Sequence, residues 1–270
     1  MPGPLARATA LFCVVSVMRL EPLRLARHSV PLPRPTAVIC DMDGLLVDSE
    51  RMERRVWRRA ARECGVELTD AHFASFVGHP ADETERQLAR LYGDAFDVAA
   101  FRERCHVQMR ALVAAEGVPL RPGAERWLEF VVGLGVPLAL ATSSGPALVR
   151  QRLGASVSAF TAVVTRADVA RGKPFPDIYL EAATRLGVAP GGCLALEDSP
   201  TGARAAVAAG MQVLVVPDLV PVPPGLVRQL VGVYPSLDDV RLEVAPRWGV
   251  VQVQNSSREV RHVRSGRSHR

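Results

Sequence analysis

The chain has 270 residues, enough for one large domain or two smaller ones. Hydrophobic residues make up 48% of the sequence and charged residues 23%, a composition that is typical of folded globular proteins and excludes full disorder. The formal net charge of +5 lies at the ends: residues 1–35 hold five arginines against one glutamate, residues 245–270 hold six against one, and the stretch between them is net negative. Nucleic-acid binding needs a basic face on a folded element, so we expect no nucleic-acid partner.

Residues 1–35 predict a disordered leader in which proline and arginine alternate with short apolar runs. Residues 10–18 resemble the apolar part of a signal peptide, but no clear small-residue cleavage site follows them. No apolar run reaches the ~18 residues needed to cross a bilayer. The five cysteines are widely spaced without a metal-ligand pattern, which indicates reduced thiols in a reducing compartment. We therefore expect a cytoplasmic protein, a monomer without a membrane partner.

Short apolar runs along the chain predict buried β-strands, and helical patterns alternate with them. The predicted strands are 37–40, 136–141, 162–165, 193–196 and 212–216. The predicted helices are 125–132, 146–153, 176–186 and 201–209. This alternation predicts an α/β fold with a Rossmann-like parallel sheet and helices on both faces. We assign residues 36–50 and 121–243 to this core.

One stretch interrupts the alternation. Between the first strand and Pro122, apolar residues recur at helical spacing and no good strand appears. Met52 and Val56 begin one such helix, Leu88 lies in a second, and Phe101 begins a third. We interpret residues 51–120 as a helical cap domain inserted into the core, and residues 244–270, which lack periodicity, as a basic disordered tail.

The residues that come directly after the predicted strands form an unusual chemical set. In parallel α/β sheets, ligands bind at the carboxyl ends of the strands. Those ends are followed here by carboxylates, hydroxyls and an amine, namely Asp41, Asp43, Thr142, Ser143, Ser144, Asp168, Lys173, Glu197 and Asp198. Lys173 is also the only lysine among 33 basic residues, which suggests that its ammonium group does something a guanidinium cannot.

Asp41 and Asp43 are two residues apart at the end of an extended strand, before a turn at Gly44. Crowded carboxylates near an apolar core repel each other, and a divalent cation would relieve that repulsion. Mg²⁺ suits the site because it needs few protein oxygens. Asp198 would supply a further ligand, and Glu197 would either bind the ion or orient its neighbours.

The same constellation suits a phosphoryl group. Mg²⁺, Lys173, the Thr142 hydroxyl and the main-chain N–H groups after Asp43 and Thr142, the latter that of Ser143, would converge on such an anion. One carboxylate could attack phosphorus to form an acyl phosphate. The other could protonate the leaving oxygen and then accept a proton from water.

With these residues in order, the sequence resembles the haloacid dehalogenase superfamily, in its β-phosphoglucomutase-like and sugar- or nucleotide-phosphatase branch. Four motifs carry the resemblance: the DMDGLLVDSE run at 41–50, LATSS at 140–144, GKPFPD at 172–177 and EDSPTG at 197–202. Their order and spacing agree with the family over about residues 36–240. The helical insert after the first motif resembles the cap of that branch, and the core would then be the catalytic domain.

The resemblance implies roles for these residues. Asp41 would be the nucleophile that becomes an aspartyl-phosphate, and Asp43 the general acid and base. Thr142 and Lys173 would bind the phosphoryl group. Asp41, the Asp43 main-chain carbonyl and Asp198 would hold Mg²⁺. The cap residues Gly78 and His79 would belong either to a substrate-facing loop or to a plain turn.

We expect a Mg²⁺-dependent phosphatase that hydrolyses a small phosphorylated metabolite. Dehalogenases of the family lack the second carboxylate of the first motif, so Asp43 favours phosphoryl transfer. A hexose-phosphate mutase on the same scaffold is the alternative. Mutases of this branch carry an arginine shortly after the cap glycine, which holds a second phosphate. Here no arginine follows Gly78 until Arg86, which favours the phosphatase. A phosphoacceptor signalling module is a more distant alternative, disfavoured by the paired aspartates and by the helical insert.

Overall fold

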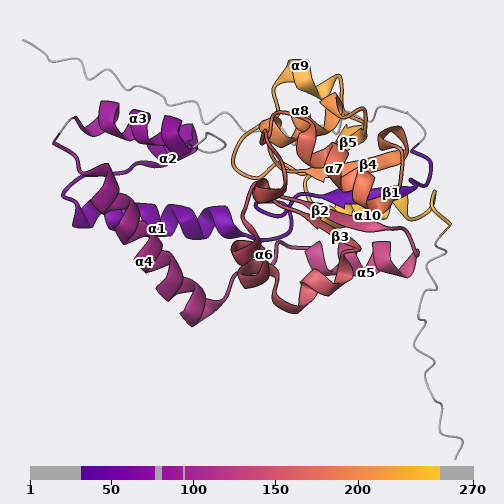
Figure 1. Cartoon of the computed structure of the whole chain (residues 1–270), viewed down its shortest axis with the longest axis horizontal. Helices are drawn as coiled ribbons and strands as arrows, with labels where there is room; N and C mark the ends of the chain where they lie inside the picture. The colour runs from indigo at the N-terminus through magenta and orange to yellow at the C-terminus, as the bar shows by residue number, and fades with distance from the viewer. Residues whose placement is uncertain (1–31, 77–80, 94, 250–270) are drawn as a thin grey trace, which may run out of the picture.

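The computed structural model describes residues 32–76, 81–93 and 95–249. Its centre is a parallel six-stranded sheet in the order β3-β2-β1-β4-β5-β6 (Figure 1). The strands are β1 (Ala37–Cys40), β2 (Leu138–Ala141), β3 (Ala162–Val164), β4 (Cys193–Glu197), β5 (Gln212–Val215) and β6 (Gly232–Val233). The predicted α/β class and Rossmann-like sheet are therefore confirmed.

The sheet is covered on both faces because its strands are apolar except at Glu197, the last residue of β4, and Gln212, the first residue of β5. All four residues of β1 are fully buried. Ala37 and Ile39 pack with the helices α7 (Asp177–Leu186) and α8 (Pro200–Ala208). Val38 and Cys40 point to the opposite face and pack with α5 (Ala124–Gly133) and α10 (Leu237–Val244). Alternate side chains of a strand point to opposite faces, so a strand between two helical layers must be apolar throughout.

Shorter elements complete this part of the chain. Helix α6 (Pro146–Leu153) follows β2 and packs through Val149 and Leu153. The remaining elements are α9 (Pro224–Val227) and the 3-10 helices η1 (Gly154–Ala159), η2 (Arg166–Asp168) and η3 (Pro190–Gly192). The short strand β6 was not predicted from the sequence, because two residues carry too little pattern.

The segment between β1 and α5 is helical, in agreement with its periodicity. It contains α1 (Ser49–Glu63), α2 (Asp70–Phe76), α3 (Ala81–Tyr92) and α4 (Val98–Glu116), which lie to one side of the sheet (Figure 1). These four helices share a hydrophobic cluster of their own. In it, the ring of Trp57 meets Phe73 and Phe101 edge-on, with centroids 5.6 and 5.5 Å apart. Trp57 therefore packs against the core of the helical segment.

The chain enters and leaves this helical segment through two neighbouring extended segments, which we call the neck (Val47 and Leu120 with their neighbours). Val47 and Leu120 form an antiparallel bridge. The N–H of Asp48 donates to the carbonyl of Pro119 at 2.9 Å, and the N–H of Arg121 donates to that of Leu46 at 2.8 Å. The division into core and cap remains a proposal, and this pairing supports it.

Both ends of the folded part extend beyond the boundaries that we predicted. Leu32, which we assigned to the leader, is buried in the core. Trp248, which we assigned to the tail, is also buried, and its indole N–H donates to the carbonyl of Leu32 at 3.4 Å. These apolar residues lie in stretches too short to show periodicity.

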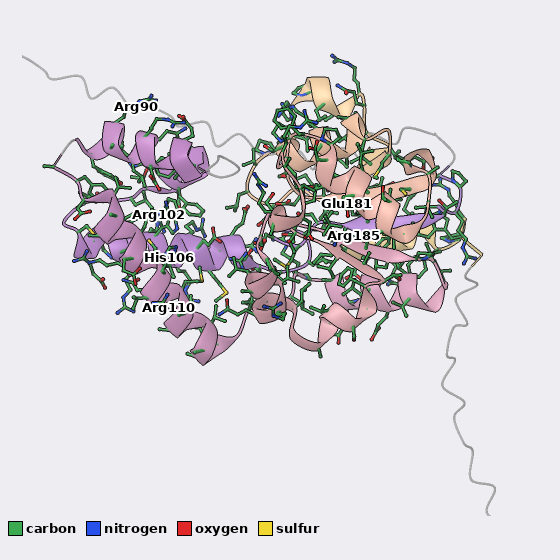
Figure 2. The ribbon with its side chains drawn as sticks, viewed as in Figure 1. Arg90, Arg102, His106, Arg110, Glu181 and Arg185 are labelled. Carbon is green, nitrogen blue, oxygen red and sulfur yellow. The ribbon has the colours of Figure 1, made fainter. Side chains whose placement is uncertain are left out.

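Cys40, Cys64, Cys105 and Cys193 are free thiols. His106 is exposed on α4, beside Arg102 and Arg110 (Figure 2). None of the helices in the described ranges is both long and apolar enough to cross a membrane.

Candidate active site

The candidate site lies at the carboxyl ends of the central strands. Strand β1 sits between β2 and β4, and Cys40 pairs with both Leu140 and Leu196. Because the three strands are parallel and in this register, the residues that follow them lie side by side. The loop after β1 is tight: the N–H groups of Leu46 and Val47 both donate to the carbonyl of Met42, at 2.9 and 3.0 Å.

Three buried carboxylates meet at this edge. Asp41, Glu197 and Asp198 each offer an oxygen within 4.8 Å of the other two, and at most 6% of each residue is exposed. Burial raises the pKa of Asp41, against the opposing effect of Lys173. Burial, with the charges of Asp41 and Glu197, raises the pKa of Asp198 well above its usual range. The cluster therefore holds more negative charge than its surroundings compensate.

Lys173 is the cation of the cluster. Its Nζ donates to Asp41 Oδ1 at 2.5 Å, to Glu197 Oε1 at 2.6 Å and to the carbonyl of Ala141 at 3.0 Å. These three acceptors use all three donors of an ammonium group. Burial alone would lower the pKa of Lys173, but the carboxylates of Asp41 and Glu197 raise it above its usual value. A compact ammonium satisfies this buried arrangement, which a planar guanidinium would not.

Glu197 is saturated with hydrogen bonds. Its Oε1 accepts from Lys173 and, at 2.5 Å, from the hydroxyl of Tyr179. Its Oε2 accepts from the hydroxyl of Ser199 at 3.1 Å and from two main-chain N–H groups. Gly202 makes room for it, since a Cβ there would lie 1.8 Å from Oε1. With both oxygens engaged, Glu197 is better placed to orient Lys173 than to bind a metal.

The Asp198 carboxylate, unlike that of Glu197, lacks hydrogen-bond donors in the part of the chain that the structure describes. Only 5% of the residue is exposed, yet no donor among the described residues contacts its carboxylate. Gly44 touches it closely: a Cβ on Gly44 would lie 2.2 Å from Asp198 Oδ2, and the φ of +82° favours glycine there as well. A buried carboxylate without a donor indicates a cation partner, and carboxylate oxygens suit Mg²⁺. Asp41, Glu197 and Asp198 against Lys173 leave two negative charges, which a divalent ion would balance.

The side chain of Asp43 turns away from this cluster toward a set of donors. Its Oδ1 accepts from the hydroxyl of Ser49 at 2.7 Å and from the guanidinium of Arg152. Its Oδ2 accepts from the hydroxyl of Ser144 at 2.7 Å, and the hydroxyl of Thr142 lies 3.5 Å away. The Asp43 carboxylate is thus oriented by three elements, and any metal contact from this residue would come from its main chain.

The other predicted residues are distributed as follows. Thr142 is fully buried, and its hydroxyl accepts from the N–H of Ser144 at 3.0 Å. Ser143 is exposed beside it. Gly78 and His79 lie outside the described residues. Asp168 is not part of the cluster, because it is bound by Arg185 of α7, which Figure 2 labels, and by the Thr165 hydroxyl and main chain, which lower its pKa to about 2.

The structure adds residues that the motifs alone did not identify. Tyr179 and Arg152 contact Glu197 and Asp43, but both come from helices outside the motifs. Glu50 lies in the first turn of α1, where acidic residues are common. However, its Oε2 is buried without a partner, and burial, together with the charge of Asp218 and other carboxylates, raises its pKa to about 8. No sequence pattern distinguishes such a glutamate from an exposed one.

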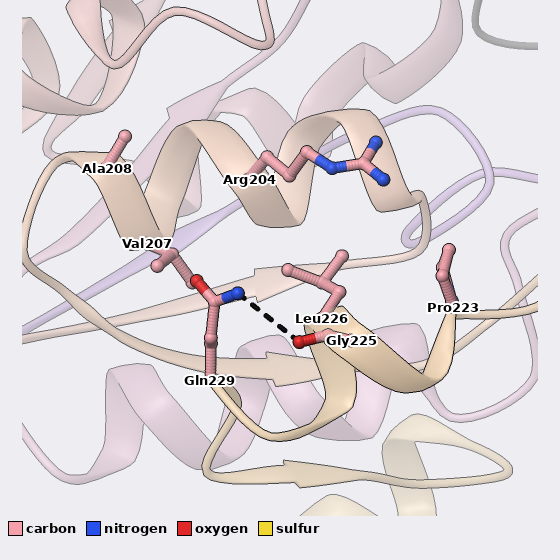
Figure 3. A pocket seen from close by; sticks show the side chains of 7 residues that line it. All are labelled: Arg204, Val207, Ala208, Pro223, Gly225, Leu226 and Gln229. Atoms are coloured by element: carbon pink, nitrogen blue, oxygen red, sulfur yellow. Dashed lines mark hydrogen bonds between the residues drawn. The ribbon is translucent and has the colours of Figure 1, made fainter.

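A separate groove lies between α8 and α9 (Figure 3). It has a volume of about 530 Å³ and is lined mainly by apolar residues, with the exposed Arg204 as its one charged side chain. None of the residues that line it belongs to the carboxylate cluster. The groove is therefore distinct from the candidate active site.

Comparison with known proteins now decides the family. A family model described as haloacid dehalogenase-like hydrolase matches residues 35–210. The chain belongs to the haloacid dehalogenase-like hydrolases. It is therefore an enzyme of the hydrolase class, and the matched region begins before β1 and includes all four motifs.

Named relatives of this hydrolase include phosphatases. The "Probable pseudouridine-5'-phosphatase" of Drosophila melanogaster is 34% identical over 197 residues, which cover 69% of this chain and 84% of that protein. The "Bifunctional riboflavin kinase/FMN phosphatase" of Arabidopsis thaliana is 30% identical over 223 residues, or 82% of this chain, which spans only 57% of that protein. A HAD family hydrolase from Deinococcus radiodurans R1, solved with bound phosphate and sodium, superposes with a TM-score of 0.68 at 30% identity, covering 82% of this chain and 99% of that one.

Proposed function

We propose that this hydrolase is a Mg²⁺-dependent phosphatase that releases phosphate from a small phosphomonoester, a sugar phosphate or a nucleotide, through an aspartyl-phosphate on Asp41. One observation carries the proposal. The buried carboxylates of Asp41 and Asp198 lie together with a surplus of negative charge, beside a lysine and a set of hydroxyls. Such a site suits a divalent cation and a phosphoryl group together.

Asp41 is the better nucleophile of the two aspartates of the first motif. Its Oδ1 is fixed by Lys173, and no donor among the described residues contacts its Oδ2. That oxygen is therefore available to attack phosphorus, while the P–O bond to the leaving alcohol breaks. The product is a mixed anhydride between the Asp41 carboxyl group and phosphate.

Asp43 would handle the protons. Its carboxyl group would give a proton to the leaving oxygen as that P–O bond breaks, so that a neutral alcohol departs. The resulting carboxylate would then accept a proton from the water that attacks the aspartyl-phosphate, which regenerates Asp41 and releases inorganic phosphate. The hydroxyls of Ser49 and Ser144, each 2.7 Å from this carboxylate, would hold it in place.

Thr142 and the main-chain N–H of Ser143 would contact the phosphoryl oxygens, and Lys173 would do so with the N–H that it donates to Asp41 Oδ1 in the absence of substrate. Lys173 is anchored by Glu197 and Ala141, so its charge stays beside the nucleophile. Asp41 and Asp198 would hold Mg²⁺, with the main-chain carbonyl of Asp43 that the family resemblance implies. When bound, the ion would offset negative charge on the phosphoryl group.

The substrate class rests on the relatives. Two of them are named for removing phosphate from a nucleotide-like ester. We therefore place the substrate among small phosphorylated metabolites, and the residues that choose between them would lie on helices α1–α4 or on the segments that join them.

The test is a phosphate-release assay on the full chain, with a panel of sugar phosphates, sugar-alcohol phosphates and nucleotides, with Mg²⁺ or with EDTA. We expect Mg²⁺-dependent release from at least one ester and none from the Asp41→Asn variant at an unchanged melting temperature. Asp70→Asn is the matched control, since Asp70 is an exposed residue of α2. Interconversion of hexose 1- and 6-phosphates without phosphate release would indicate the mutase instead, and stable labelling without turnover would indicate a phosphoacceptor.

A further inference from the structure

Arg152 joins two carboxylates from different parts of the fold. It lies in the last turn of α6, and only 10% of its side chain is exposed. Its Nη1 donates to Asp43 Oδ1, and its Nη2 donates to Glu53 Oε1 at 3.2 Å. Glu53 belongs to α1, the first helix after the neck. One guanidinium thus connects the loop after β1, the end of α6 and the beginning of the helical segment.

This arrangement needs an arginine. A buried guanidinium without partners costs several kcal/mol, so its two carboxylate partners are part of what makes the position tolerable. A planar fork can bind two acceptors on different elements at once, whereas an ammonium group acts as a single point charge. No contact of Arg152 with Asp41, Glu197 or Asp198 exists among the described residues. Its influence is therefore confined to the Asp43 side of the site.

Asp43 depends on α1 and α6 for its orientation. Its closest donors come from α1 (Ser49), from the loop that leads into α6 (Ser144) and from α6 itself (Arg152), and the Thr142 hydroxyl lies farther away, at 3.5 Å. Among these donors only Arg152 is charged, and its guanidinium is also held by Glu53. Charge-assisted hydrogen bonds are about twice as strong as neutral ones, so Arg152 contributes most to this orientation.

We propose that Arg152 is a positioning residue for Asp43, and that Glu53 makes this positioning depend on helix α1. The inference rests on the proposed function, in which Asp43 protonates the leaving oxygen. Arg152 does not touch the phosphoryl group. Loss of the Arg152 guanidinium should therefore slow cleavage most for esters whose leaving alcohol is strongly basic, because such alcohols depend most on protonation.

The experiment compares three esters whose leaving alcohols increase in basicity: 4-nitrophenyl phosphate, phenyl phosphate and benzyl phosphate. For Arg152→Gln we expect kcat/KM on benzyl phosphate to fall by on the order of 10²-fold, as for loss of a general acid, while 4-nitrophenyl phosphate changes only a few-fold. Arg150→Gln is the matched control, because Arg150 is an exposed arginine of the same helical turn. We expect it to match the wild type on all three esters.

Two further variants keep the inference testable if Arg152→Gln folds poorly. Arg152→Lys, which keeps the charge and loses the fork, should fall between the wild type and Arg152→Gln on benzyl phosphate. Glu53→Gln should show the same preference for activated esters to a smaller degree. An equal loss of kcat/KM on all three esters, or wild-type kinetics in both Arg152 variants, would overturn the role of Arg152. Wild-type kinetics in Glu53→Gln would overturn the link to α1. If the wild type cleaves neither these esters nor any member of the metabolite panel with Mg²⁺, the proposed function fails instead.

Discussion

The two aspartates of the first motif each lie beside their own cation. Lys173 holds Asp41 from one side, and Arg152 holds Asp43 from the other. The two carboxylates therefore point into different environments although they are two residues apart. Asp41 lies in the cluster with Glu197 and Asp198, and Asp43 lies among hydroxyls and a guanidinium. This separation suits two different tasks, attack and proton transfer.

The role of Asp43 can be tested by replacing its carboxyl group with an amide, which cannot exchange the proton. Asp43→Asn keeps an acceptor for Ser49 and Arg152 but cannot serve as an acid or base. We expect kcat for the best alkyl phosphate to fall ~10²–10⁴-fold. The measurement is steady-state kinetics, with circular dichroism to verify the fold. A variant that keeps wild-type turnover on an unactivated ester would exclude Asp43 as the general acid.

Gly44 offers a test of the proposed metal site in which none of the proposed ligand residues is substituted. In Gly44→Ala the new Cβ would overlap Asp198 Oδ2, so the carboxylate has to move. We expect the Mg²⁺ concentration for half-maximal activity to rise roughly 10–100-fold, as for changes that disturb ligand orientation. Gly65→Ala is the control, because Gly65 also has a positive φ but nothing lies near its Cβ position. Equal Mg²⁺ requirements in the two variants would contradict this reading of the site.

The sequence predicted the residues of the cluster because motif residues lie at strand ends. It could not predict how their side chains divide into two groups, since this depends on Tyr179 and Arg152, which approach from helices. It also gave no sign that Glu50 Oε2 is buried without a hydrogen-bond partner among the described residues. Burial of a polar residue is decided by the packing of distant segments, and a single sequence does not contain that information.

At the scale of elements, strands and long helices were predictable, and short elements were not. β1 and α6 have the predicted bounds. Helix α2 was missed, because its seven residues have little periodicity and are held by Phe73 and Phe76 packing on Trp57. Its stability comes from tertiary contacts, which is common for helices this short.

The aromatic cluster of the helical segment predicts a large effect for one substitution. Phe101 is 1% exposed, and its ring lies 5.5 Å from that of Trp57 and 5.6 Å from that of Phe96. We expect Phe101→Ala to lower the free energy of unfolding by about 3–5 kcal/mol, because it leaves a cavity. Chemical denaturation measures this loss. Leu91→Ala on the exposed side of α3 serves as control. A comparable loss of unfolding free energy in Leu91→Ala would show that the aromatic cluster does not contribute more to stability than an exposed apolar residue.

At the scale of the whole molecule, the unbalanced carboxylates predict a dependence of stability on pH. Burial and neighbouring charges raise the pKa of Glu50 to about 8, and burial raises that of Asp41. Raised pKa values mean that the folded state binds these protons more tightly than the unfolded state. The stability that these two carboxyl groups contribute is complete below their usual, unfolded-state pKa. It is lost as the pH rises through their folded-state pKa.

We therefore expect the metal-free protein to lose stability between about pH 5 and about pH 8. Mg²⁺ supplies the missing positive charge only when the carboxylates are ionised, so its stabilising effect should grow over the same range. Thermal unfolding with EDTA and with Mg²⁺ at both pH values measures the Mg²⁺-induced change in Tm. A Mg²⁺-induced shift in Tm that is no larger at the higher pH would refute the argument.

The neck has a consequence for how such a chain can change. The helical segment departs and returns at adjacent points, so a core without it would need only a brief connection, which costs little chain entropy. Helices α1–α4 can then be lengthened, shortened or exchanged while the pairing of the six strands stays the same. Under the proposed function, selection among esters could diverge in this way without disturbing the acidic residues that we propose as catalytic.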